Sequence, residues 1–383
     1  LPAMFAGTKY ATCFPIGTMD VVMNFKPQTL RDYYEKWYRP DLQGIVVVGD
    51  IDVDAVETQI KKLFADVPAQ PNAAKREYYP VNDNKEPIVL IARDKEQPHI
   101  QAIVFNKHKA TPASEKDKIG YLVENYATNL INNMLNARLN ELLQEANPPY
   151  IYAGSYDGDF FVAKTKQAFT GIVVCKEDAV ESGIATLLRE MERARRFGFT
   201  ESEYQRARAE YLRNLESAYN ERDKRKNDEY INEYVRHFLD NEPIPGIENE
   251  YGIISQIAPS IPVEPLNMMM QTLVTDTNQV VAIFGPEKEN LKMPTEDAIK
   301  KILHDVKAEE LAPYVDKVSD EPLMKETPKG GKIISEQKDD VFGTTMLTLS
   351  NGVKVIIKKT DFKADEIIMK GVSLGGSSLF PDS

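Results

Sequence analysis

The sequence is poor in cysteine and histidine and contains no long apolar run. Its 383 residues include two cysteines and four histidines. No run approaches the roughly 18 to 20 apolar residues that a membrane-spanning helix needs, so no transmembrane segment is predicted. The cysteines, Cys13 and Cys175, are far apart in the chain and have small or apolar neighbours. They predict either a buried pair of thiols or one disulfide, and neither alternative selects a cellular compartment.

The sequence also has fewer basic residues than acidic ones. The chain has 47 lysines and arginines against 59 aspartates and glutamates, which gives a net charge of −12 and a pI near 5.1. This balance disfavours a nucleic acid or an anionic membrane as the partner. With 42% apolar and 28% charged residues the composition is that of an ordinary globular protein. The length predicts two or three domains.

The usual signatures of a catalytic or metal site are missing. The four histidines contain no pair three or four residues apart, and there is no Cys-x-x-Cys. A phosphate-binding loop and a Gly-x-Ser-x-Gly elbow are absent as well. We therefore predict no catalytic residue and no metal ligand in this chain, assign no substrate-binding residue, and interpret the histidines as surface or capping residues. They are His99, His108, His237 and His304.

One stretch, residues 29–52, reads as a compact helix–turn–strand unit. Its aromatic and aliphatic residues recur at helical spacing on a helix that Thr29 can cap, and Pro40 ends that helix. The β-branched run Ile45–Val48 then predicts a strand buried on both faces. The same order of elements recurs at residues 262–285, so the chain is expected to contain the ends of two related domains. The predicted buried face of the first helix comprises Leu30, Tyr33, Tyr34, Trp37 and Tyr38.

The remaining pattern alternates between helices and short strands. Asp52 is expected to cap a helix, a long helix is expected to begin at Pro112, and Thr200 with Glu203 forms a capping box for a charged helix that runs towards Leu239. The turn Asn351-Gly352 predicts a hairpin over 346–358. Strands are expected at residues 88–91, 100–105, 150–156, 160–164, 169–175 and 367–374, the first two paired side by side, and linkers at 69–86 and about 307–340.

Several motifs together resemble the pitrilysin/insulinase family of zinc metallopeptidases. LRDYYEKWYRPDLQGIVVVGDID is similar to the segment that closes the family's catalytic domain, and Tyr10-Ala11 with Pro15-Ile16-Gly17 to the loop before it. Further matches follow in the family's order. They are residues 134–139 (MLNARL), 199–204 (FTESEY), 280–286 (VVAIFGP), 349–355 (LSNGVKV) and 375–377 (GGS).

The resemblance implies an α+β fold of repeated two-layer domains, each a mostly antiparallel sheet covered by helices. It implies the end of a first, catalytic-type domain at 1–75, a whole second domain at 76–306, a linker at 307–342 and the start of a third domain at 343–383. The sequence has no initiator Met and no signal peptide, and we expect it to be an internal piece of a longer polypeptide of four such domains.

In the family, zinc is bound by a His-x-x-Glu-His motif and a distal Glu, and none of these residues is present here. The resemblance therefore implies zinc in the full-length protein, none in this chain, and no activity of the chain alone. Members also clamp the substrate backbone with an Arg and a Tyr in their second half. Gln144 stands near the position of that Arg, so we interpret Tyr150 as a packing residue.

The expected function is a part of a zinc endopeptidase that encloses and hydrolyses peptides. The alternative is a family member without catalysis that serves as a structural or peptide-binding subunit; a scaffold outside the family is disfavoured. The expected partners are a peptide or unfolded protein substrate and the remaining domains of the same polypeptide. Such two-half relatives suggest the bacterial periplasm or cell envelope.

Overall fold

The fold is that of a computed structural model, which describes residues 2–13, 16–318, 321–322, 324–363 and 366–379. Pro15 of the expected loop motif lies outside the described residues. The chain divides into two compact units, one of Leu1–Arg213 with Asn227–Asp316 and one of Asn214–Lys226 with Lys317–Ser383. The domain boundaries inferred from the sequence stay a prediction.

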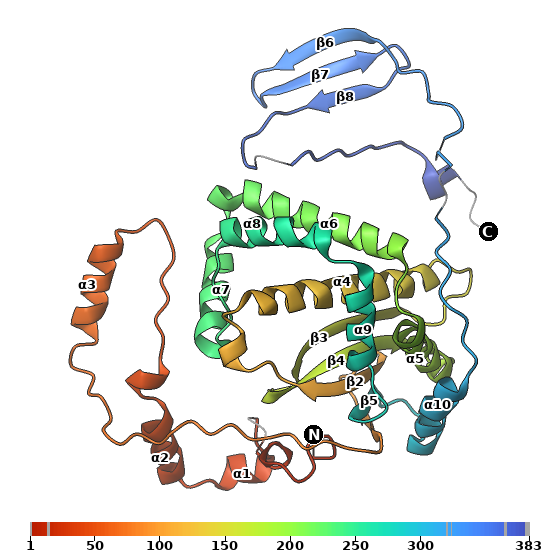
Figure 1. Ribbon diagram of the computed structural model, residues 1–383. Coiled ribbons are helices and arrows are strands. Elements are labelled where there is room, and N and C mark those ends of the chain that lie inside the picture. The colour runs from red at the N-terminus through yellow and green to blue at the C-terminus, as the bar shows by residue number, and fades with distance from the viewer. Residues whose placement is uncertain (1, 14–15, 319–320, 323, 364–365, 380–383) are drawn as a thin grey trace. The chain divides into compact units, whose positions relative to one another are not determined.

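The larger unit is built on a five-stranded sheet (Figure 1). Its order is β1-β5-β2-β4-β3, and only the β1–β5 pair is parallel. The expected mostly antiparallel α+β fold is therefore confirmed, but the expected pairing of the first two strands is wrong. The nearly continuous apolar run of β5, buried along almost its whole length, lies between them. The strands are β1 (Ile88–Asp94), β2 (Ile100–Lys109), β3 (Tyr152–Phe160), β4 (Ala163–Cys175) and β5 (Gln279–Pro286).

Helices and a loop cover the sheet. Helix α4 packs against β3, and α5 packs against β4, α9 and α10. The core-facing side of α4 is fully buried at Leu130, Ile131 and Leu135. A second cluster is formed by Met4 and Phe5 of the N-terminal loop with sheet residues that include Phe105 and Phe160. The helices of this unit are α1 (Met19–Asn24), α2 (Pro27–Trp37), α3 (Val53–Leu63), α4 (Ile119–Leu142), α5 (Val180–Phe197), α7 (Asn227–Asp240), α8 (Ile247–Ile257), α9 (Val263–Leu273) and α10 (Glu296–Ala308).

The predicted N-terminal unit forms only in part. Its helix is α2, but this begins at Pro27, where proline suits the first helical position, so the predicted cap at Thr29 is wrong. Residues 45–48 form no strand, and Ile45 and Val47 are about half exposed. The aromatic face of α2 is likewise uncovered, with exposed fractions of 57–61% at its members other than Trp37, which is half-buried. A strand needs a hydrogen-bonded neighbour, and the described residues supply none here.

Other boundaries shift for local reasons. Pro112 is extended and precedes a short 3₁₀ turn, so α4 begins at Ile119 instead. The three strands expected between 150 and 175 are two, β3 and β4, joined by a tight turn in which Phe161 has φ +59. The charged helix breaks at residues 221–226 into α6 (Glu201–Asn220) and α7. The cap predicted at Asp52 is confirmed, since its carboxylate accepts from the Ala55 N–H at 2.9 Å. The cap predicted at Thr200 is also confirmed, since its hydroxyl accepts from the Glu203 N–H.

The smaller unit holds a three-stranded antiparallel sheet of β6 (Ile333–Asp339), β7 (Thr344–Leu349) and β8 (Lys354–Ile357). The predicted hairpin is confirmed, with Gly352 at φ +84. Strand β6 lies within the expected linker. The strand expected at 367–374 is wrong, because these residues are exposed and unpaired in the part of the chain that the structure describes.

Candidate functional site

The described residues contain no group of three or more His, Cys, Asp and Glu side chains that could hold a metal ion. The donor set for zinc is therefore not met by the residues described. His99 and His304 are exposed, while His237 Nδ1 lies 2.7 Å from the Glu242 carbonyl oxygen. His108 contacts Asp157. That this chain binds no zinc stays a prediction.

Both cysteines are free thiols, so neither sequence alternative holds. Cys13 is exposed and Cys175 is buried. Burial raises the pKa of the Cys175 thiol to about 12, which makes it an inert core residue. No helix of the described residues is both long and apolar enough to cross a bilayer.

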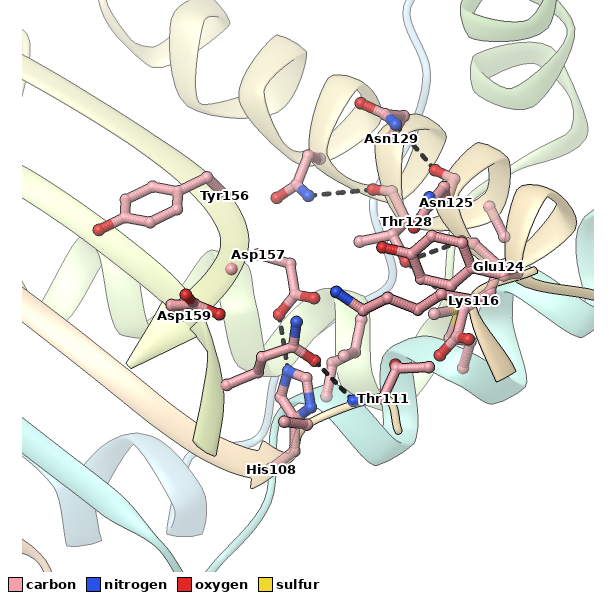
Figure 2. Close-up of a pocket in the computed structure, with 18 of the residues that line it drawn as sticks. His108, Thr111, Lys116, Glu124, Asn125, Thr128, Asn129, Tyr156, Asp157 and Asp159 are labelled. Carbon is pink, nitrogen blue, oxygen red and sulfur yellow. Dashed lines mark hydrogen bonds and ion pairs between the residues drawn. The ribbon is translucent and has the colours of Figure 1, made fainter. Parts of the chain in front are cut away.

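A wide groove lined by both polar and apolar groups lies beside β3 in the larger unit, with a volume of about 1560 Å³ (Figure 2). Its walls come from several separate parts of the chain, among them the end of β2, residues 120–136 of α4, strand β3, the end of α7, and α9. Strand β3 is an edge strand, because β4 is its single neighbour in the sheet. An edge strand presents unpaired backbone N–H and C=O groups, which can pair with another extended chain.

Ion pairs hold the walls of the groove together. Lys116 Nζ donates to Glu242 Oε1 at 2.5 Å, and the Tyr121 hydroxyl donates to both oxygens of the same carboxylate. Lys164 lies 2.9 Å from Asp159 and 2.7 Å from Asp240. These pairs join β3 and the start of α4 to the segment after α7, so the groove has a fixed shape and little net charge.

His108 and Asp157 form a further pair at the floor of the groove, with 2.7 Å between Nε2 and Oδ1 (Figure 2). The side chains are 24% and 16% exposed. Burial alone would lower the pKa of His108, but the hydrogen bond and charge of Asp157 outweigh it, and the net pKa is raised. Such a pair orients β3 but offers no nucleophile or metal for bond cleavage. The pair therefore links β3 to the end of β2.

Two of the motifs that carried the family resemblance meet in the core of the larger unit. Arg138 of residues 134–139 and Glu203 of residues 199–204 meet in a buried ion pair, with Arg138 Nε 2.6 Å from Glu203 Oε1. Glu203 also accepts from the Thr200 N–H at 2.8 Å, as the capping box predicted. Tyr150 is fully buried and donates to the Leu139 carbonyl at 2.7 Å, which confirms its packing role.

The groove itself was missed in the sequence, although a signal was present. Asparagines recur at helical spacing along one face of α4, at positions 125, 129, 132 and 136, all in the groove wall. Asparagine is a poor helix former, because its side chain competes for the backbone. A row of four on one face therefore indicates a surface that makes specific hydrogen bonds.

Comparison with known proteins agrees with this fold. Residues 24–211 match the family described as "Peptidase M16 inactive domain". Over 99% of its length the chain is 27% identical to "Zinc protease PQQL-like" of Arabidopsis thaliana and 24% identical to "Probable zinc protease PqqL" of Escherichia coli. It covers 36% and 40% of these two relatives.

The crystal structure of the periplasmic protease PqqL from E. coli has the same fold, with a TM-score of 0.70 at 23% identity over 94% of this chain and 39% of that one. The expected resemblance is thus confirmed, and the names of the relatives are those of zinc proteases. Together the family match over residues 24–211, the two relatives and the shared fold support the assignment of this chain to the M16 (pitrilysin/insulinase) type of peptidase, without that family's zinc-binding motif.

Proposed function

We propose that this chain is the non-catalytic, substrate-enclosing part of a zinc-dependent metalloendopeptidase. The observation that carries the proposal is the open edge of β3 along a wide groove, in a chain whose described residues offer no metal site. An extended peptide can add to such an edge through backbone hydrogen bonds, which accept many sequences. A peptidase that encloses varied peptides needs a surface of this kind.

The partners follow from the same proposal. The substrate is a peptide or an unfolded protein, and the zinc ligands belong to other domains of the same polypeptide, which agrees with the 36–40% of the relatives' length that the chain covers. The E. coli relative of known structure is a periplasmic protease, and we extend the periplasm or cell envelope to this protein as part of the proposal.

The alternative within the family is a homologue that binds peptides or supports an assembly without cleaving anything. It is favoured by the description of the matching family as an inactive domain. The two functions differ in whether the rest of the polypeptide carries a working zinc site.

Zinc analysis and peptide hydrolysis together test the proposal. The full-length polypeptide and the 383-residue chain are purified in parallel, and zinc per chain is measured by atomic emission. We expect one zinc and cleavage of a fluorogenic peptide by the full-length protein, and neither by the chain. A folded full-length protein without zinc or cleavage would establish the binding homologue. Stoichiometric zinc on the chain alone would contradict the proposal that the zinc ligands lie in other domains.

A further inference from the structure

The edge of β3 is closed at one residue by a side chain of α4. Asn136 Oδ1 accepts from the Ser155 backbone N–H at 2.6 Å, and Asn136 Nδ2 donates to the Ser155 carbonyl at 3.1 Å. A residue of a neighbouring antiparallel strand would make these same two bonds. The amide of Asn136 thus stands in for one residue of an added strand.

Further contacts keep Asn136 in this position. The Ser155 hydroxyl donates to Asn132 Oδ1 at 2.9 Å and to Asn136 Oδ1 at 3.2 Å. Ser155 is 8% exposed, and α4 packs along β3. An incoming chain would have to displace a set of mutually bonded groups to reach Ser155.

The open part of the β3 edge lies beyond Ser155, at Asp157 and Asp159. In an antiparallel strand, alternate residues direct both backbone groups to the same side. Since the groups of Ser155 bond to Asn136 and not to β4, those of Asp157 and Asp159 face the open edge as well. The register of β3 with β4 is regular from Gly154 to Asp159. Both aspartates line the groove (Figure 2).

We propose that Asn136 sets the register of the bound peptide. It closes the edge at Ser155, so an extended peptide pairs with Asp157 and Asp159 and ends its pairing there. This proposal rests on the proposed function of β3 as a peptide-binding edge. The ligand is an extended polypeptide segment with free backbone N–H groups, and a proline at a pairing position would abolish its binding.

Amide hydrogen exchange, resolved at single residues of β3, tests the role of Asn136. The chain is compared with Asn136→Ala, with Asn136→Asp, which keeps the acceptor for the Ser155 N–H, and with Asn129→Ala as the matched control. Asn129 lies on the same face of α4, and its amide donates to the Asn125 carbonyl. We expect Asn136→Ala to speed exchange at Ser155 by about tenfold, as loss of one hydrogen bond predicts, while Asn136→Asp and Asn129→Ala leave it slow.

The probe is a soluble peptide of alternating threonine and lysine, and its control has proline at every second position. In the unchanged chain the probe should slow exchange at Asp157 and Asp159 and leave Ser155 as it was. In Asn136→Ala it should slow Ser155 too and bind about tenfold more tightly.

Two results would overturn the proposal in different ways. Protection of Asp157 by the probe, with no response of Ser155 in Asn136→Ala, would refute the role of Asn136 and leave β3 as the peptide site. Protection of no β3 amide in any variant would refute the edge as a peptide site and the register proposal with it.

Discussion

Replacing Glu203 by glutamine should destabilise the larger unit severely. The carboxylate is 4% exposed and lies 2.6 and 2.9 Å from two nitrogens of Arg138, itself 2% exposed. The Arg138 guanidinium carbon lies 4.8 and 4.3 Å from the ring centroids of Phe199 and Tyr314, so side chains surround the cation. Glutamine keeps the shape but leaves Arg138 as an uncompensated buried cation. Breaking a buried pair in this way costs about 3 to 5 kcal/mol.

Urea denaturation, followed by circular dichroism, measures this cost. Thr200→Ala is the control, since it removes the cap but keeps the ion pair and should cost about 1 kcal/mol. The double variant Arg138→Met with Glu203→Leu should recover most of the stability, because it removes both charges together. A loss below about 1 kcal/mol for Glu203→Gln, typical of an exposed pair, would refute the reasoning.

Three further changes have defined outcomes. Burial lowers the pKa of Lys107 to about 8, so the free energy of unfolding should rise between about pH 8 and pH 10.5, and Lys107→Met should abolish this rise in urea titrations. The raised pKa of His108 stabilises the fold most below its unfolded value of about 6.5 and less as pH rises past the folded value. Asp157→Asn should therefore lower the melting temperature more at about pH 5 than at about pH 8, and an equal loss would contradict this. Gly198 has φ +69, and a Cβ there would lie 2.3 Å from a side chain of α9, so Gly198→Ala should cost about 1 to 3 kcal/mol, whereas Gly120→Ala in α4, where a Cβ meets nothing within 4 Å, should stabilise.

Local patterns predicted local structure well. The capping box at Thr200 and Glu203 and the hairpin at Gly352 each depend on residues a few positions apart, and both form. The partner of Glu203 was not predictable in this way, because Arg138 lies 65 residues away. The strand expected at Ile45 failed for a related reason, since a β-branched run becomes a strand only where a neighbour pairs with it.

The groove was still harder to predict from the sequence, because it too depends on contacts between distant segments. Its walls come from segments that are up to about 195 residues apart, from Tyr78 to Leu273. The sequence predicted a long helix here but assigned no role to the side on which the asparagines lie. Whether Asn136 faces solvent or an edge strand depends on the order of strands in the sheet, and pattern alone gave that order incorrectly for β1 and β2.

The place of β5 between β1 and β2 has a consequence for how the polypeptide folds during synthesis. Strand β1 joins the sheet only through β5, which follows it by about 190 residues. Until β5 leaves the ribosome, β1 has no sheet partner and the side of β2 that β5 will cover stays open. Such long-range pairing slows folding and leaves apolar strand edges exposed to other chains. The newly made polypeptide should therefore depend on chaperones until the last strand of its sheet has been made.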